Sequence, residues 1–139
     1  MAFLIPFVPE HLAKMKVKAD AHEVADTPGV SETLVRLGAK SLVAGDGTVL
    51  GVIGVAPTLP GVCEVFILAS EDQTRFPISF ARCVHKEVSK LCAKYRRIQA
   101  VTENDNFHRR WITWLGFQEE GVLRRYGLRG QDMVMWSLV

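Results

Sequence analysis

The stretch from Ile98 to Gly121, IQAVTENDNFHRRWITWLGFQEEG, decides the fold because it predicts a strand, a helix and a second strand in direct succession. Ile98 to Thr102 is a short apolar-rich run, and Asn104 or Asp105 after it is a suitable helix N-cap. Apolar residues then recur at i, i+4, i+7 and i+8, at Phe107, Trp111, Trp114 and Leu115. We therefore expect a helix with a heavily aromatic face, on which Trp111 and Trp114 are either both core residues or one of them is exposed and binds a partner.

The sequence after this helix predicts an antiparallel hairpin. Gly116 stands where a helix C-cap belongs, and an apolar-rich run begins at Phe117 and continues to Tyr126. The turn residues Gly127 to Gly130 connect it to a second run, Gln131 to Leu138.

The first half of the chain alternates short strands and helices without a linker or repeat. Pro6 places the first strand at a sheet edge, Pro9 and Ser31 are helix starts, and Gly45-Asp46-Gly47 is a hairpin turn. The expected elements are a strand at Phe3 to Val8, a helix from Pro9 restarting near Ala19 to Val24, a helix from Ser31 to Leu37, strands at Ser41 to Ala44 and Val49 to Val55, a loop at Pro57 to Gly61, and a strand at Val62 to Ala69.

The longest helix is expected to begin near Thr74 to Pro77 and to run to about Tyr95. Its apolar positions share one face: Phe80, Val84, Val88, Leu91, Cys92 and Tyr95. Its basic residues repeat every four positions on another face, at Arg82, Lys86, Lys90 and Lys94. Such a stripe is typical of a solvated helix face, with binding of a polyanion as the alternative.

Composition is that of one globular domain spanning residues 1–139, since 48% of the residues are hydrophobic and 23% are charged. A long helix between two strands favours parallel pairing, whereas the hairpins favour antiparallel pairing. We therefore expect an α/β (α+β) fold with a mixed sheet of about six or seven strands and helices on both faces. No run of 18 apolar residues is present, so a membrane span is not expected.

Three cysteines, Cys63, Cys83 and Cys92, lack the spacing of a metal site, so we expect buried, reduced thiols and no bound metal.

Charge is uneven along the chain. Residues 1–74 carry five Lys/Arg and nine Asp/Glu (−4), and residues 75–139 carry twelve and six (+6). The second half is thus the candidate surface for an anionic partner.

The order of elements resembles that of the GNAT acyltransferase superfamily over nearly the whole chain, most closely from Val101 to Phe117. The resemblance implies a site for acetyl-CoA, with Leu68, Ala69, Arg75 and Asn104 as the candidate contacts. In the superfamily, the pyrophosphate binds to a Q/R-x-x-G-x-G/A turn between the fourth strand and the long helix.

The segment of this chain at that turn, Ser70 to Phe80, contains no glycine. Pro77 lacks an N–H, and Glu71 and Asp72 would repel a phosphate. The segment therefore argues against the usual cofactor site.

The catalytic pattern of the superfamily is also incomplete. Many members use a tyrosine of the last helix to protonate the departing thiolate, and Ile112 falls near that position here, between Trp111 and Thr113. Glu64 and His108 are the remaining candidates for a general acid or base. Both residue types are more often ordinary surface groups at such positions.

A narrower resemblance fits these departures. The run NDNFHRRWITWLGF, preceded by FPISFARCVHKEVSKLCAKY, is similar to the small GNAT-like internal virion (internal core) proteins of short-tailed bacteriophages. These proteins share the turn without glycine and an N-x-x-x-R-W-L-x-W-L-G-F helix. The matching residues are Asn106, Arg110, Trp111, Trp114, Leu115, Gly116 and Phe117, and Ile112 replaces a leucine.

Two hypotheses follow. The first is a non-catalytic GNAT-fold phage protein that acts in virion assembly, as an internal or virion-associated component or as an assembly factor, without a cofactor. It would be made in the host cytoplasm and could enter the virion. Its partners would be other virion proteins, an acidic protein or DNA, contacted through Arg109, Arg110, Arg124 and Arg125. The second is an acyl-CoA-dependent N-acyltransferase with an atypical pyrophosphate turn.

Overall fold

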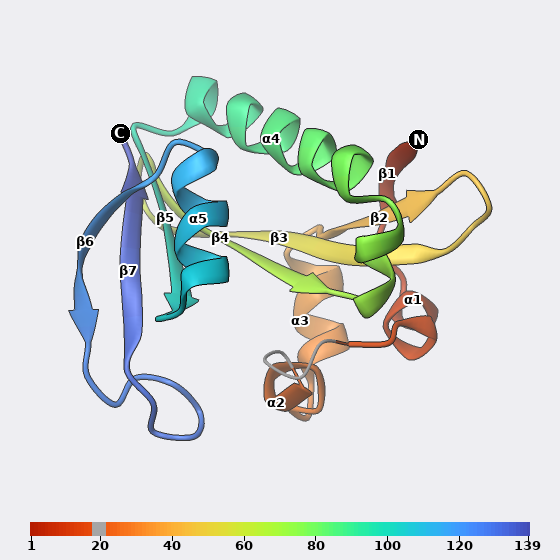
Figure 1. The fold of residues 1–139 in the computed structure, drawn as a ribbon, viewed down its shortest axis with the longest axis horizontal. Coiled ribbons are helices and arrows are strands. Elements are labelled where there is room, and N and C mark those ends of the chain that lie inside the picture. Colours follow the sequence, from red (N-terminus) through yellow and green to blue (C-terminus); the bar gives the residue numbers. More distant parts are fainter. Residues whose placement is uncertain (18–21) are drawn as a thin grey trace. The chain divides into compact units, whose positions relative to one another are not determined.

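The computed structural model describes residues 1–17 and 22–139 (Figure 1). The elements follow one another as β1 (Ala2–Pro6), α1 (Pro9–Lys14), α2 (His22–Ala25), α3 (Val30–Arg36), β2 (Lys40–Ala44), β3 (Val49–Leu59), β4 (Val62–Ala69), the 3-10 helix η2 (Glu71–Arg75), α4 (Pro77–Lys94), β5 (Arg97–Glu103), α5 (Asn106–Trp114), β6 (Gln118–Leu123) and β7 (Met133–Leu138). The helix expected to restart near Ala19 is described from His22 onward, and residues 18–21 lie outside the described part.

The strands form one seven-stranded sheet in the order β1-β2-β3-β4-β5-β7-β6. β4 and β5, which α4 connects, pair in parallel from Val62↔Arg97 to Glu64↔Gln99. The pairs β1–β2, β2–β3, β5–β7 and β6–β7 are antiparallel. The predicted α+β class with a mixed sheet is therefore confirmed.

The chain divides into two compact units. Unit 1 comprises Met1–Val55 and Phe66–Glu87, and unit 2 comprises Ala56–Val65 and Val88–Val139. Each unit has buried apolar residues of its own. In unit 2 these are Val62, Cys63, Val65, Val88, Ile98, Ala100, Ile112, Leu115, Phe117, Val134 and Trp136.

Helices lie on both faces of the sheet in unit 1. Val52 belongs to a core cluster with Leu34 of α3 and with Met15, which follows α1. A Cβ at the next strand position, Gly51, would meet the ring of Phe80 of α4 at 3.3 Å. Because successive strand residues point to opposite faces, α3 and the start of α4 cover opposite sides of β3, as Figure 1 shows.

Local signals explain why α5 begins and ends where it does. The Asp105 carboxylate accepts a hydrogen bond from the backbone N–H of His108, so of the two caps that the sequence allowed, Asn104 and Asp105, the second caps the helix. At the other end, Gly116 has φ of 100°, a left-handed conformation that glycine adopts without a steric penalty. Phe117 is buried directly after this turn.

The aromatic face of α5 is only partly buried, which corrects the expectation that both tryptophans are core residues and fits the alternative that one of them is exposed. Phe107 is 58% exposed and Trp114 is 54% exposed, whereas Ile112, on the other side of the helix, is buried. The apolar spacing defined the stripe correctly but did not show which side of the helix faces the core. One branched aliphatic residue, helped by Leu115 and Phe117, anchors the helix.

Two boundaries also differ from the prediction. Ser31 is not an N-cap, because α3 starts one residue earlier and Gly29, with φ of 82°, occupies the cap position and accepts the first helical hydrogen bond from Thr33. The loop expected at Pro57 to Gly61 is shorter, because β3 continues through Leu59 and the chain reverses at Gly61, with φ of 80°.

The cysteines are not all buried. Cys63 is buried and burial raises the pKa of its thiol, so it favours the unreactive protonated form. Cys83 is half-buried with a raised thiol pKa, and Cys92 is exposed, which corrects the expected position of Cys92 on the apolar face of α4. Among the described helices, none has the length and apolar composition that crossing a membrane requires.

Candidate functional site

The segment between β4 and α4 is a tight turn whose backbone donors are engaged within the protein. The Ser70 N–H donates to Leu50 O at 2.9 Å, and the Glu71 N–H donates to Lys16 O at 2.7 Å. Ser70 is fully buried, and its Oγ accepts from the Asp72 N–H at 3.2 Å. These bonds fix the entry to η2 from two distant parts of unit 1.

Backbone N–H groups in the second half of the turn are also hydrogen-bonded within the protein. The Gln73 N–H donates to Ser70 O and the Phe76 N–H donates to Gln73 O, both at 3.1 Å. Pro77 follows at the first position of α4 and has no N–H. Five backbone N–H groups of this segment are thus bonded internally and a sixth position has none, whereas an anion site would need N–H groups that point outward.

The charges at this turn are also paired. Arg75, which we considered as a pyrophosphate ligand, lies 3.7 Å from Asp46 and 3.9 Å from Asp72, and its guanidinium lies over the Phe76 ring. A hydrogen bond from the Thr48 N–H lowers the pKa of Asp46, so this carboxylate stays ionised opposite Arg75. Arg75 is therefore held by acidic neighbours.

Leu68 and Ala69, the two candidate acetyl-CoA contacts on β4, have structural roles in this fold. Leu68 is buried in the core cluster of unit 1, and Ala69 is half-buried. Leu68 O lies 2.9 Å from the place that a Cβ would take at Gly51, so the backbone of β4 is tightly packed there.

Glu64 belongs to a row of polar side chains that crosses the sheet of unit 2. Its Oε1 accepts from Gln99 Nε2 at 3.1 Å, and Gln99 Oε1 in turn accepts from Arg97 Nε at 3.1 Å. Arg97 continues the row to Glu120, whose carboxylate also accepts from Ser137 Oγ. The row joins four strands through one chain of hydrogen bonds, so Glu64 has a partner that positions it.

His108, the second acid or base candidate, is tied to the N-cap of α5. Its Nδ1 lies 2.7 Å from Asp105 Oδ2, and its backbone N–H donates to Asp105 Oδ1 at 2.8 Å. A carboxylate at Nδ1 fixes the ring orientation and directs Nε2 outward. The same contacts are also what a helix N-cap needs for its own stability.

Asn104 and Arg109 form a second group at this end of α5. Asn104 Oδ1 accepts from Arg109 Nε at 2.8 Å, and Arg109 Nη1 lies 2.7 Å from Glu119 Oε1. The Arg109 guanidinium also lies over the ring of Trp136. The structure therefore brings Asn104 and Arg109 together, but as an internal clamp between α5 and β6.

The position expected for a catalytic tyrosine is filled by an apolar residue. Ile112 is buried in unit 2, and the neighbouring Trp111 and Thr113 carry no acid suited to protonating a thiolate. The two tyrosines of the chain lie elsewhere, Tyr95 after α4 and Tyr126 after β6.

The remaining partner candidates are exposed. Arg110 lies on the outer face of α5, and Arg124 and Arg125 follow β6. Trp111 and Trp114 stack on one another, with ring centroids 5.6 Å apart and planes at 19°. The sequence did not show this pairing, although the i, i+3 spacing of two large rings permits it.

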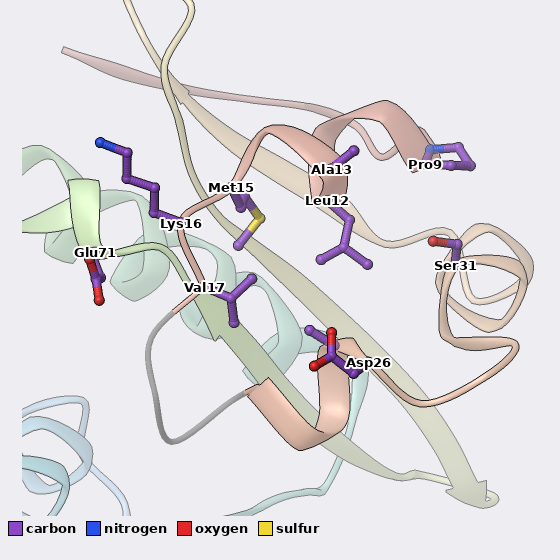
Figure 2. Close-up of a pocket in the computed structure, with 10 residues that line it drawn as sticks. Pro9, Leu12, Ala13, Met15, Lys16, Val17, Asp26, Ser31 and Glu71 are labelled. Atoms are coloured by element: carbon purple, nitrogen blue, oxygen red, sulfur yellow. The ribbon is translucent and has the colours of Figure 1, made fainter.

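Unit 1 contains a pocket of about 650 Å³ that the sequence did not predict. Figure 2 shows Met15 and Leu12 in the middle of the view, between Glu71 of η2 on the left and Ser31 of α3 on the right, while the side chain of Lys16 points away from Leu12. The lining residues are Pro9, Leu12, Ala13, Met15, Lys16, Val17, Ala25, Asp26, Ser31 and Glu71.

Within the described residues, no cluster of His, Cys, Asp and Glu suits a metal ion.

Solved structures resemble this chain over almost its whole length. A GNAT-family acetyltransferase from Bacillus anthracis superposes with a TM-score of 0.77 at 12% identity, covering 99% of this chain and 94% of its own. Ard1 from Thermoplasma volcanium gives 0.77 at 14% identity, with 99% and 96% covered. The fold is that of the GNAT acetyltransferases. A Bacillus subtilis acetyltransferase in complex with CoA gives a TM-score of 0.71 at 17% identity, with 99% and 96% covered. No protein-family model and no curated protein matches the sequence.

The GNAT fold raises the question of whether the turn after β4 suits the pyrophosphate of an acyl-CoA. A pyrophosphate needs outward-pointing backbone N–H groups and a positive potential. The N–H groups of five residues of this turn, Ser70, Glu71, Asp72, Gln73 and Phe76, are bonded to Leu50, Lys16, Ser70 and Gln73, and the turn carries the acidic Glu71 and Asp72. The residues of the turn therefore do not fit a bound pyrophosphate in the observed conformation.

Proposed function

We propose that this chain uses the GNAT fold as a non-catalytic binding scaffold in bacteriophage virion assembly, either as an internal or virion-associated component or as an assembly factor. The internal hydrogen bonding of the turn between β4 and α4 carries the non-catalytic part of the proposal. Opening that turn for a phosphate would break the bonds of Ser70 and Glu71 to Leu50 and Lys16. The carbonyl oxygen of Leu50, a fully buried residue, would then lose its donor, and a buried polar group left unpaired costs about 1–3 kcal/mol.

The bacteriophage part of the proposal is supported by the resemblance of α5 and the residues after it. The matching residues have two different roles in the fold. Leu115 and Phe117 are buried, whereas Arg110 and Trp114 are exposed. Because the shared motif includes exposed residues as well as core residues, it is consistent with a shared contact surface in addition to a shared fold.

Ligand binding tests the non-catalytic part. The purified chain is titrated with acetyl-CoA by calorimetry and heated with millimolar acetyl-CoA or CoA in a thermal-shift assay. We expect no saturable heat and no rise in Tm, because a ligand that binds the folded state must stabilise it. Saturable binding followed by transfer of the acetyl group to an amine would overturn the proposal.

A genetic experiment tests the assembly part. The coding sequence is removed from the phage genome that contains it, and particle yield, packaged DNA and particle composition are measured. We expect fewer complete particles, and recovery when the intact chain is supplied in the host. A normal yield of infectious particles without the chain would contradict an assembly role.

The second candidate function is acyl-CoA-dependent N-acyl transfer, which the comparisons favour, because two of the structural neighbours described above are acetyltransferases and one of these was solved with CoA. Under this candidate, Glu64 or His108 would accept the proton of the amine. Glu64→Gln and His108→Gln would then each lower kcat, by about 10²–10⁴-fold for a general base. Without measurable turnover in the unaltered chain, this candidate is abandoned.

A further inference from the structure

All acidic side chains of unit 2 are engaged within that unit. Unit 2 contains six Asp/Glu, and each has a hydrogen bond or ion pair. The pairs are Glu64 with Gln99 (3.1 Å), Glu103 with Gln131 (3.0 Å), Asp105 with His108 (2.7 Å), Glu119 with Arg109 (2.7 Å), Glu120 with Arg97 (2.6 Å) and Asp132 with the Arg125 N–H (2.9 Å). The negative charge of unit 2 is therefore largely neutralised or hydrogen-bonded internally.

The basic side chains of unit 2 are in excess. The unit has nine Lys/Arg against six Asp/Glu, a net charge of +3. Within residues 1–17 and 22–139, no hydrogen bond or ion pair involves the guanidinium groups of Arg110, Arg124 and Arg125, all on exposed residues. The charge that unit 2 presents to a partner is therefore positive.

One of these cations lies within an apolar patch on α5. Phe107, Arg110, Trp111 and Trp114 follow one another at i, i+3, i+4 and i+7, so they form one stripe along the helix, which we call the α5 stripe. Phe107 is 58% exposed and Trp114 is 54% exposed, and stacking holds Trp114 against Trp111. Ile112, on the opposite side of the helix from Phe107 and Trp114, is the buried residue of α5.

We infer that the α5 stripe binds an acidic amphipathic segment of a partner protein, whose aliphatic side chains cover Phe107 and Trp114 and whose carboxylates meet Arg110. Tryptophan and arginine are the residue types that dominate the energy of protein contacts. This inference rests on the proposed function, since it assigns a partner chemistry to a chain that acts through protein contacts.

A protein segment fits the stripe better than a nucleic acid does. Binding of a single strand needs open ring faces for the bases and a row of cations for the phosphates. Trp111 and Trp114 cover one face of each other, and the adjacent Arg109 is committed to Asn104 and Glu119. Arg110 is the one cation in the stripe.

The experiment uses the full chain and a synthetic amphipathic peptide with leucine on one helical face and glutamate on the other. Binding is followed by tryptophan fluorescence and by calorimetry at low and at raised salt. The same peptide with lysine in place of glutamate is the matched probe, and an oligothymidylate of similar charge is the competing anion. We expect saturable binding of the acidic peptide alone, weakened by salt.

Variants locate the binding site. Arg110→Glu and Trp114→Ala should each weaken binding of the acidic peptide about tenfold or more, and Trp114→Phe should retain part of it. Lys86→Glu makes the same charge change at an exposed residue of α4 in unit 1, and Ile78→Ala shortens another exposed side chain there. Both controls should bind as the unaltered chain does.

Three results would overturn the inference: no saturable binding of the acidic peptide, equal binding by Arg110→Glu, or tighter binding of the oligothymidylate through the same residues. These results are separate from the acetyl-CoA titration. A chain that binds neither the peptide nor acetyl-CoA disproves the partner chemistry alone, whereas transfer from acetyl-CoA disproves the non-catalytic function.

Discussion

The guanidinium of Arg97 on β5 holds the carboxylate of Glu120 on β6 with two hydrogen bonds, Nη2 to Oε1 at 2.6 Å and Nη1 to Oε2 at 2.8 Å. β7 lies between these strands, and its Ser137 donates to the same carboxylate at 2.6 Å. Arg97 first, and Ser137 second, lower the pKa of Glu120 from 4.5 to about 2. The pair thus joins the last three strands of the sheet order.

This contact predicts a specific pH dependence of stability. A carboxyl whose pKa is lowered by folding stabilises the folded state above its unfolded pKa, and that contribution is lost as the pH falls through the folded pKa. For Glu120 the loss occurs between about pH 4.5 and pH 2. Glu120→Gln should therefore flatten the fall of unfolding free energy in this range, measured by urea denaturation at several pH values.

The control for this prediction is Glu32→Gln, which removes an exposed carboxylate of α3 in unit 1. Its pH profile should follow that of the unaltered chain. A Glu120→Gln profile as steep as the unaltered one between pH 4.5 and pH 2 would show that the Arg97 pair does not persist in solution.

Gly51 should be intolerant of a side chain. A Cβ there would lie 2.9 Å from Leu68 O, a backbone atom of the neighbouring strand, and 3.3 Å from the Phe80 ring. Because the strand backbone cannot move without breaking its pairing, Gly51→Ala should destabilise the protein by about 1–3 kcal/mol. Gly45→Ala is the matched control, since no atom lies within 4 Å of its added Cβ. Equal denaturation midpoints for the two variants would refute this account.

The sequence predicted the sheet and the long helix well because both depend on local patterns. The β4 strand was expected at Val62 to Ala69 and has those bounds, and α4 runs from Pro77 to Lys94, within one residue of its expected end. Alternating or four-residue spacing of apolar side chains is a property of neighbouring residues. The turn glycines Gly61 and Gly116 likewise act on their own backbone.

The candidate site was less predictable because it depends on residues distant in sequence. The missing glycines of the turn were visible, but the acceptors of its donors, Leu50 O and Lys16 O, are brought to it by folding. The exposure of Trp114 depends on which side of α5 the rest of unit 2 covers. Periodicity gives two faces of a helix and leaves that choice open.

Asp105 should contribute more to the free energy of unfolding as the N-cap of α5 than as the charged partner of His108. Asp105→Ala removes the acceptor for the His108 N–H and should cost about 0.5–2 kcal/mol of unfolding free energy. Asp105→Asn keeps an oxygen acceptor at the cap and should retain most of the stability. If the two variants lose equal stability in urea denaturation, the carboxylate charge beside His108, rather than the cap, is the stabilising contact.

Restoring glycines to the turn before α4 should not restore binding of CoA. Phe76→Gly with Ile78→Gly, in one chain, creates the spacing Gln73-x-x-Gly-x-Gly that the superfamily motif requires. The donors of Glu71 and Gln73 remain bonded to Lys16 O and Ser70 O, Pro77 still has no N–H, and Glu71 and Asp72 still repel an anion. Calorimetry of the double variant with CoA should therefore show no saturable heat. Gly45→Ala, which is expected to fold like the unaltered chain, is titrated in the same way as the control. Saturable binding by the double variant would mean that the two missing glycines, and not the internal bonding of the turn, exclude the pyrophosphate.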